Sequence, residues 1–282
     1  MSVPPPDPGL VTDLVRAFLA EDVGRGDRTT EPTVTADAMG KARIVAREPA
    51  VIAGITIAAE CFSCMDRNAI LEPVSYDGSR VTEGETVAEI HGPLRAILTA
   101  ERTALNLLAR LSGVATFTNR FVTSVRDTPA KILDTRKTTP GLRMVEKYAV
   151  RVGGGHNHRA GLYDGILIKD NHLLAAGGIA EAISRVRSAA RDASPVEVEV
   201  ADLDGLREAL EAGADLVLLD NMSVDAVRAA VALASGSVVL EVSGGVNLGN
   251  VRAYAETGVE RISVGALTHS APSIDVSLEL IA

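Results

Sequence analysis

The sequence is poor in aromatic and in basic residues. Aromatic residues make up 3% of the 282 positions and tryptophan is missing, so we do not expect a surface that stacks the bases of single-stranded nucleic acid. Acidic residues outnumber basic ones by 37 to 28, and the formal charge of −9 argues against general electrostatic binding to nucleic acid or to an anionic membrane. Any anionic ligand must therefore be bound at a local site.

Membrane segments and cysteine pairs are also scarce. The N-terminal residues show no basic start followed by an apolar stretch, and no apolar run reaches the roughly 18 to 20 residues of a membrane helix, so we expect a cytoplasmic protein. The two cysteines, Cys61 and Cys64, lie in a helical-looking stretch, and no second pair follows at zinc-binding spacing. We interpret them as thiols of the core or the surface.

The first part of the chain mixes helical and β-rich patterns. An apolar fraction of 46% predicts a large core, in one large domain or two ordinary ones. An amphipathic helix is predicted over residues 10–21, short β-rich runs begin at Lys41, and helical periodicity extends over 94–126. We expect an N-terminal α+β domain over 1–112, with the segment 271–282 as a candidate to pack with it.

The second part repeats a strand and then a helix. Six short β-branched runs recur, in KILDTRK, YDGILIKDN, PVEVEV, ADLVLLDN, SVVLEVSGG and ERISVGAL, and YAVRVGG is a candidate for a seventh. This repeat is typical of a parallel sheet or a (β/α) barrel. We predict an α/β fold with an incomplete (β/α) barrel of six or seven parallel strands over residues 113–270.

Polar or charged residues follow nearly every predicted strand. Because the carboxyl ends of barrel strands meet at one face, these side chains are expected to converge there. They form the candidate active site, although this pattern does not name the reaction. In strand order they are Asp134, Arg136 and Lys137; Lys169 and Asp170; Glu199; Asp220 and Asn221; Glu241 and Ser243; and Gly265.

The charge of the candidate site is positive although the chain is acidic. Residues 131–172 contain eight basic and four acidic side chains, a net charge of +4, which leaves −13 for the rest. Arginine and lysine on loops suit a small ligand with several negative charges. We interpret His156 and His158 as part of this anion site rather than as a metal pair. Arg143, Lys147 and Arg151 follow at four-residue steps and are expected to form a solvated stripe on a helix.

Glycine-rich stretches follow the last two predicted strands, in VSGGVNLGN and VGALTHS. They free backbone N–H groups and lead toward helix starts, which predicts a phosphate site there. Glu199 and Asp220, near this site, could hold Mg²⁺ or the hydroxyls of a ribose.

Several long motifs resemble those of the quinolinate phosphoribosyltransferase family. They include DTRKTTPGLR, GGGHNHRAGL, DGILIKDNH, VEVEV, AGADLVLLDNM, LEVSGGVN and YAETGVERISVGALTHS, with EDVGRGDRTT and LTAERTALNLLARLSG upstream. The resemblance extends over nearly the whole chain. It implies phosphoribosyl transfer from phosphoribosyl pyrophosphate to quinolinate with Mg²⁺, giving nicotinate mononucleotide, pyrophosphate and CO₂ in NAD biosynthesis.

The resemblance also implies an assembly and roles for residues. It suggests a homodimer or larger assembly in which Arg102 reaches the quinolinate site of the neighbouring subunit. Lys137, Lys169, Glu199 and Asp220 would be the catalytic residues, with Glu199 and Asp220 as the metal ligands. The substrate-binding set would be Arg102, Thr135, Arg136, Lys137, His158, Arg159, Lys169, Glu199, Asp220, Ser243, Gly244, Gly245, Val264, Gly265 and Ala266.

Two alternatives stay open at the level of sequence. One is a related phosphoribosyltransferase acting on another pyridine or pyrimidine acid, such as nicotinate, or a related paralogue associated with molybdenum transport. A substrate with one carboxylate needs fewer cations than the group of Arg102, Arg136, His158 and Arg159 provides. The other is a barrel that binds a dicarboxylate or phosphosugar without turnover, against which Lys137, Lys169, Glu199 and Asp220 argue.

Overall fold

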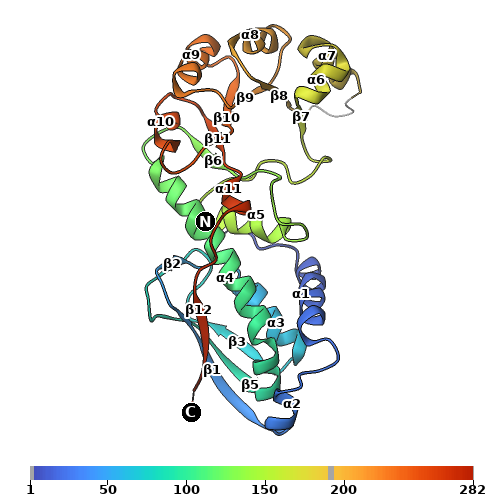
Figure 1. Ribbon diagram of the computed structural model, residues 1–282, viewed down its shortest axis with the longest axis vertical. Helices are drawn as coiled ribbons and strands as arrows, with labels where there is room; N and C mark the ends of the chain where they lie inside the picture. Colours follow the sequence, from blue (N-terminus) through green and yellow to red (C-terminus); the bar gives the residue numbers. More distant parts are fainter. Residues whose placement is uncertain (1–2, 190–193, 282) are drawn as a thin grey trace. The chain divides into compact units, whose positions relative to one another are not determined.

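A computed structural model of the chain describes residues 3–189 and 194–281, which fall into two units (Figure 1). The N-terminal unit consists of Met1–Asn119, Thr139–Gly154 and Ser270–Ala282, and the barrel unit consists of Arg120–Thr138 and Gly155–His269. The domain boundary at residues 112 and 113 stays a prediction. Each unit is described in turn.

An antiparallel sheet forms the centre of the N-terminal unit. Its strand order is β12 (Val276–Ile281), β1 (Met39–Ala46), β5 (Thr86–Pro93) and β3 (Ile70–Pro73), and a small two-stranded sheet joins β2 (Ala50–Val51) to β4 (Arg80–Val81). The C-terminal strand β12 therefore forms one edge, paired with β1 from Lys41 with Ile281 to Ala46 with Val276. Gly92 on β5 permits close approach of the turn that precedes β3, because a Cβ there would lie 2.3 Å from the carbonyl oxygen of Asn68.

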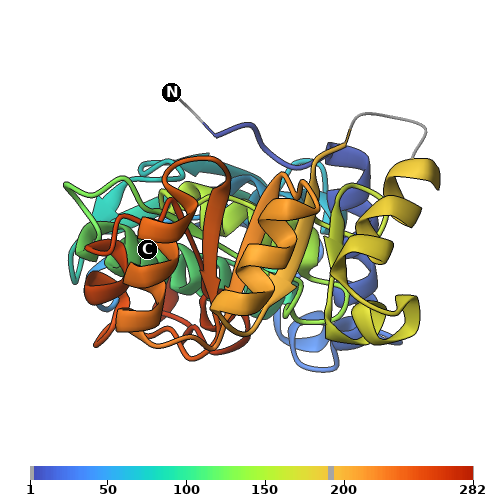
Figure 2. The ribbon, with the colours of Figure 1, turned by 90° about the horizontal axis from the view of Figure 1, so that it is seen from above.

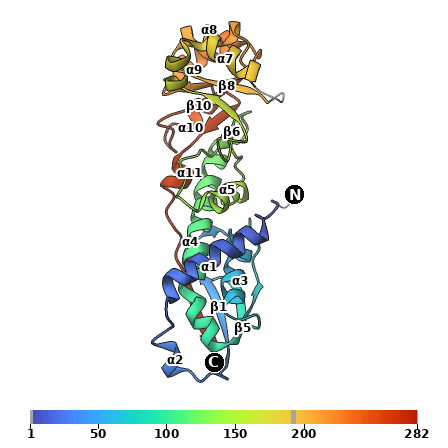
Figure 3. The same cartoon turned by 90° about the vertical axis from the view of Figure 1, so that its right-hand side faces the viewer.

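Five helices of the described residues accompany this sheet. They are α1 (Pro8–Val23), α2 (Thr30–Thr33), α3 (Ile55–Met65), α4 (Leu94–Ser124), whose last turns belong to the barrel unit, and α5 (Arg143–Val152). Helix α1 begins after Asp7, whose carboxylate accepts the N–H of Leu10, and it contacts α3 (Figure 3). Cys61 and Cys64 lie on α3 as free thiols, and burial raises the pKa of Cys61 to about 12.

A six-stranded parallel sheet forms the barrel unit. Its order is β6 (Lys131–Leu133), β11 (Arg261–Ser263), β10 (Val239–Ser243), β9 (Leu216–Asp220), β8 (Val196–Val200) and β7 (Ile166–Ile168). The helices that alternate with these strands are α6 (Asp170–Ala176), α7 (Ile179–Ala189), α8 (Leu203–Glu211), α9 (Val224–Ala234), α10 (Val251–Ala255) and α11 (Ala266–His269) (Figures 1 and 2). The edges are β6 and β7, which agrees with the predicted α/β class and incomplete barrel.

The candidate seventh strand over residues 148–154 is wrong. Most of this stretch belongs to α5, which buries Val145, Tyr148 and Val150. The β-branched valines suggested a strand, but their spacing also suits a helix that is buried over much of its surface. A parallel bridge instead joins Leu133 to His156 beside β6.

The predicted solvated stripe on α5 is also wrong. Lys147 is 5% exposed, and Arg143 and Arg151 are half-buried. The guanidinium of Arg151 lies 5.8 Å from the ring centre of Tyr148, and its Nη2 donates to the carbonyl of Pro4. These cations pack within the N-terminal unit, because their long aliphatic stems can be buried when the charged group finds a partner. Across the described residues, no helix is both long and apolar enough to span a membrane.

Candidate active site

A cavity of about 570 Å³ opens at the carboxyl ends of the strands in the barrel unit. Most of the predicted site residues line it, which places cations and carboxylates from different strands around one space. Five further residues that were not in the predicted substrate set also line it: Leu167, Leu218, Asn221, Glu241 and Ser263. The predicted residues in the lining are Thr135, Arg136, Lys137, His158, Arg159, Lys169, Glu199, Asp220, Ser243, Gly244 and Gly245.

The loop after β6 presents two of the cations. The hydroxyl of Thr135 accepts the N–H of Lys137 at 3.0 Å, and the N–H of Thr138 donates to the carbonyl of Arg136 at 3.0 Å. The hydroxyl of Thr268 donates to the carbonyl of Lys137 at 2.8 Å. These bonds fix the backbone that carries Arg136 and Lys137, so less conformational entropy is lost when a ligand binds.

Arg136 and Arg159 form a cationic pair in the lining. Burial, and then the positive charge of Arg136, hold the pKa of Arg159 below its ordinary value. Its Nη1 donates to the carbonyl of Gly165 at 3.1 Å. The two positive charges repel each other, and an anion bound to both would relieve that repulsion. The pair therefore suits a ligand with more than one carboxylate.

Asp134 organises the loop that carries the histidines. Its side chain is fully buried, and it accepts the N–H of His158 at 2.9 Å and the Nδ2 of Asn157 at 2.5 Å. Its place at the end of β6 had suggested a residue that faces the ligand. The structure assigns it instead to holding the 155–159 loop.

Both ring nitrogens of His158 have protein partners. Nδ1 accepts the N–H of Arg159 at 2.8 Å, and Nε2 lies 3.1 Å from Oε2 of Glu197. A ring nitrogen that accepts an N–H carries no proton, so these partners assign the proton to Nε2. His158 thereby connects the backbone of Arg159 to the buried glutamate of β8.

Glu197 and Glu241 lie beside His158 as a buried acidic pair. Glu241 is fully buried on β10, accepts the hydroxyl of Ser263 at 2.5 Å, and lies 3.6 Å from the ring of His158. Burial and then the negative charge of Glu197 raise the pKa of Glu241 to about 7. The strand pattern predicts Glu241 at the candidate site, although without a role in binding, and it does not predict Glu197 there. The available signal was the placement of glutamates within strands that are otherwise apolar.

Lys169, Glu199 and Asp220 occupy another part of the lining. The ammonium of Lys169 is in contact with Oε2 of Glu199, and Oδ2 of Asp220 accepts the side-chain amide of Asn221 at 2.7 Å. The backbone N–H of Lys169 donates to Nδ1 of His172 at 2.9 Å, at the start of α6. Two carboxylates on the adjacent strands β8 and β9 offer hard oxygen ligands, which fits Mg²⁺ bound together with substrate oxygens.

The loop after β10 is glycine-rich for a steric reason. Gly244 has a φ of +92°, and a Cβ there would lie 2.2 Å from Oδ1 of Asn221. Gly245 has a φ of +61° and no atom within 4 Å of such a Cβ. Helix α10 has only five residues and α11 only four, so the contribution of their dipoles to phosphate binding is small. The backbone N–H groups of the loop are expected to contribute more.

The remaining predicted residues are outside the lining. Val264, Gly265 and Ala266 follow β11, and a Cβ on Gly265 would lie 3.0 Å from Cδ of Lys137, so this turn borders the cavity. Arg102 belongs to the N-terminal unit, where it is exposed on α4 and lines a hollow with Ile274.

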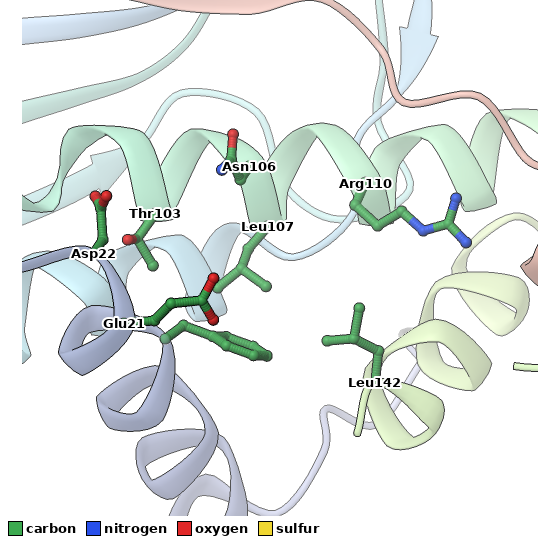
Figure 4. A pocket seen from close by; sticks show the side chains of 8 residues that line it. Glu21, Asp22, Thr103, Asn106, Leu107, Arg110 and Leu142 are labelled. Carbon is green, nitrogen blue, oxygen red and sulfur yellow. The ribbon is translucent and has the colours of Figure 1, made fainter. Parts of the chain in front are cut away.

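A second cavity, of about 360 Å³, lies in the N-terminal unit (Figure 4). The carboxylates of Glu21 and Asp22 from α1 and side chains of α4 line it. Its cation, Arg110, already binds Oε1 of Glu146 at 2.7 Å and the carbonyl of Ala271 at 2.7 Å. Two carboxylates and an engaged arginine do not suit an anionic ligand, so the barrel cavity is the candidate active site.

Comparison with known proteins gives matches to both parts of the chain. The family model "Quinolinate phosphoribosyl transferase, N-terminal domain" matches residues 27–112, and "Quinolinate phosphoribosyl transferase, C-terminal domain" matches residues 114–279. A probable nicotinate-nucleotide pyrophosphorylase [carboxylating] of Bacillus subtilis is 47% identical over 267 residues, covering 95% of this chain and 92% of the relative. The nicotinate-nucleotide pyrophosphorylase [carboxylating] of Mycobacterium leprae is 46% identical over 276 residues, covering 95% and 96%.

A solved structure is similar over the same length. The nicotinate-nucleotide pyrophosphorylase from Francisella tularensis superposes with a TM-score of 0.93 at 44% sequence identity, covering 97% of this chain and 96% of that chain. The C-terminal family model and these relatives extend over the cavity residues.

Proposed function

The chain belongs to the quinolinate phosphoribosyl transferase family, and from this premise we propose how its residues carry out the reaction. Its activity is that of a nicotinate-nucleotide pyrophosphorylase (carboxylating), a step of NAD biosynthesis whose substrates are quinolinate and phosphoribosyl pyrophosphate. The observation that carries the residue assignment is one cavity lined by two arginines, two lysines and two strand-end carboxylates.

Quinolinate binds to the cationic side of this cavity. Arg136 and Arg159 take its two carboxylates, because guanidinium groups bind carboxylates through paired hydrogen bonds and this pair gains by losing its mutual repulsion. His158 holds the backbone of Arg159 through Nδ1, which favours a positioning role for its ring. Direct binding of a carboxylate by His158 stays a prediction.

Phosphoribosyl pyrophosphate binds to the opposite side. Ser243, Gly244 and Gly245 supply backbone N–H groups for the 5-phosphate, with Val264, Gly265 and Ala266 as the adjoining turn. Glu199 and Asp220 accept the ribose hydroxyls. The same two carboxylates would hold Mg²⁺, which when bound supplies positive charge against the departing pyrophosphate.

The chemistry needs orientation and charge compensation more than a nucleophilic side chain. The ring nitrogen of quinolinate attacks C1 of the ribose, and the bond from C1 to the pyrophosphate oxygen breaks with its electron pair on pyrophosphate. Lys137 and Lys169 stabilise the negative charge that develops on the departing pyrophosphate. Thr135 holds the loop that carries Lys137.

Loss of CO₂ then follows from the new charge on the ring. The carboxylate next to the nitrogen departs, and its bonding electrons stay on the ring carbon beside the cationic nitrogen before that carbon takes a proton. Arg136 and Arg159 keep the ring fixed through its other carboxylate. The product is nicotinate mononucleotide.

The last part of the proposal concerns the assembly of subunits. We place Arg102 of the partner subunit at the quinolinate site of a homodimer, since Arg102 is exposed on its own unit and the lining of the barrel cavity does not include it. A cytoplasmic location stays a prediction.

The test is a turnover assay with purified protein, Mg²⁺, phosphoribosyl pyrophosphate and quinolinate labelled in the carboxylate next to nitrogen. We expect equal amounts of labelled CO₂, pyrophosphate and nicotinate mononucleotide. Turnover with nicotinate and none with quinolinate would contradict the assignment. Lys169→Met, which removes the ammonium but keeps an unbranched side chain, is expected to lower kcat/KM about 100- to 1000-fold.

A further inference from the structure

Two buried glutamates, Glu197 and Glu241, form what we call the floor of the barrel cavity. Glu241 lines the cavity and is itself buried, and Glu197 is 5% exposed on the neighbouring part of the sheet. One carboxylate oxygen of each glutamate and one ring nitrogen of His158 all lie within 4.8 Å of one another. Two ionised carboxylates at this spacing would oppose the binding of a substrate that itself carries two negative charges.

The hydrogen bonds around the glutamates are incomplete for two carboxylates. Within the described part of the chain, Oε1 of Glu197 and Oε2 of Glu241 are buried without a hydrogen-bond partner. An ionised carboxylate only accepts hydrogen bonds, whereas a protonated one also donates. A proton on Glu241 gives this buried carboxyl group a donor and removes one buried charge.

The groups that face Glu241 from each adjacent element do not supply a full counter-charge. Strand β8 contributes Glu197, the loop contributes His158, whose Nδ1 is used as an acceptor, and β11 contributes Ser263 and Arg261. On β9 the residue in register is Leu218, which is apolar. Burial therefore favours the neutral form, and the direction of the raised pKa agrees with that geometry.

We propose that Glu241 is a positioning residue of the reaction, held as a neutral carboxylic acid beneath the substrate pocket while quinolinate binds. In this form the floor carries the single negative charge of Glu197, to which the Nε2–H of His158 donates. When Glu241 ionises, the cavity that Arg136 and Arg159 also line gains a second negative charge, and the affinity for the dianion falls. This inference rests on the proposed function, because the ligand it concerns is quinolinate.

The dissociation constant of quinolinate is expected to increase with pH. Quinolinate is a dianion across neutral and mildly alkaline pH, so its own charge stays constant there. Burial raises the pKa of Glu241 to about 7, so its ionised form is expected to prevail above that pH. The dissociation constant of quinolinate should therefore rise by about tenfold or more between about pH 6 and pH 8.5 in the wild-type protein.

The experiment is calorimetric titration of full-length protein with quinolinate across this range, without the second substrate or metal. Glu241→Gln keeps the shape and cannot ionise, so its dissociation constant is expected to stay within about twofold across the range. Glu256→Gln, which removes the same charge from an exposed helix pair with Arg252, serves as the matched control and should follow the wild type. An equal pH dependence in Glu241→Gln and wild type would assign the effect to another group, such as His158, and overturn the proposal.

A second readout does not depend on the ligand. Infrared difference spectra should show the carbonyl band of a protonated carboxylic acid in wild-type protein near pH 6, lost at high pH and missing in Glu241→Gln. If this band is absent from the wild type, the proposal is wrong. If the band is present but quinolinate binds at no pH, the proposed function fails and the neutral state of Glu241 stands.

Ser263→Ala provides a further variant if Glu241→Gln does not fold. The hydroxyl of Ser263 stabilises the ionised form of Glu241, so its removal should move the midpoint of both the infrared change and the binding change to higher pH. A midpoint that is unchanged or moves to lower pH would contradict the proposal.

Discussion

Gly244 and Asn221 show how one missing side chain shapes the active-site rim. Gly244 adopts a positive φ, and the space where its Cβ would lie is occupied by the amide oxygen of Asn221. Asn221 itself has a φ of +54°, and its amide donates to Asp220. The glycine loop and the carboxylate of β9 are therefore fitted to each other through one asparagine.

Gly244→Ala is expected to disrupt this fit. The new methyl group would meet both the side chain and the backbone N of Asn221, so the loop must move, at a cost of about 1 to 3 kcal/mol beyond that of positive φ alone. Gly245→Ala has the positive φ but open space, and should lose only about 1 kcal/mol of unfolding free energy. Urea denaturation and the KM for phosphoribosyl pyrophosphate measure both effects. Equal losses in the two variants would show that Asn221 does not restrict the loop.

Helix α5 depends on one buried ion pair. Glu146 is fully buried near its start, and it accepts from Nη2 of Arg110 at 2.7 Å and from the backbone and hydroxyl of Thr139 at 3.0 and 2.8 Å. Arg110 also donates to the carbonyl of Ala271. The pair thus connects α4, α5 and the C-terminal segment within the N-terminal unit.

Removing one partner of this pair should be costly. In Glu146→Ala the half-buried guanidinium of Arg110 loses its counter-charge and Thr139 loses its acceptor, so the free energy of unfolding should fall by about 3 to 5 kcal/mol. Glu256→Ala breaks an exposed pair with Arg252 and should change stability by less than about 1 kcal/mol. Urea denaturation followed by circular dichroism measures both. A loss in Glu146→Ala no larger than in the exposed variant would mean that the pair does not stabilise α5.

The positions of the barrel strands and most of the cavity-lining residues could be predicted from the sequence, because both depend on local pattern. The strand-end position of Lys169, Glu199 and Asp220 follows from the repeat, since parallel strands must bring those ends together. The helix α5 could not be separated from a strand by its valines. Glu197 was not predicted at the site and Glu241 was predicted there without a role, because their roles depend on pairing across strands and on the ring of His158, which no local pattern encodes.

At the scale of the whole molecule, the negative net charge and the cationic cavity serve different purposes. The formal charge of −9 favours solubility, while Arg136, Lys137, Arg159 and Lys169 concentrate positive charge in the barrel cavity. The exposed Arg102 of the N-terminal unit adds a cation that the lining of its own chain's cavity does not include.

Mixing two inactive variants tests whether Arg102 acts on a partner subunit. Arg102→Ala and Lys137→Ala are each expected to be inactive, and in a mixed dimer one of the two sites contains both native residues. Subunits that mix at random should then recover roughly a quarter of the wild-type activity. A mixture of Lys137→Ala with Lys169→Ala, which affects the same cavity, should recover none. No recovery in the first mixture under conditions of proven subunit exchange would rule out action in trans.

The edge strand β12 has a consequence for synthesis on the ribosome. The side chains of Arg43 on β1 and Glu279 on β12 are hydrogen-bonded across the sheet although they are 236 residues apart in the chain. At the usual rate of translation, β1 must wait on the order of 10 to 50 s for this neighbour to emerge. The barrel unit can therefore form before the sheet that precedes it in sequence. Until β12 emerges, β1 has an unpaired edge, which is a site for aggregation or for chaperone binding.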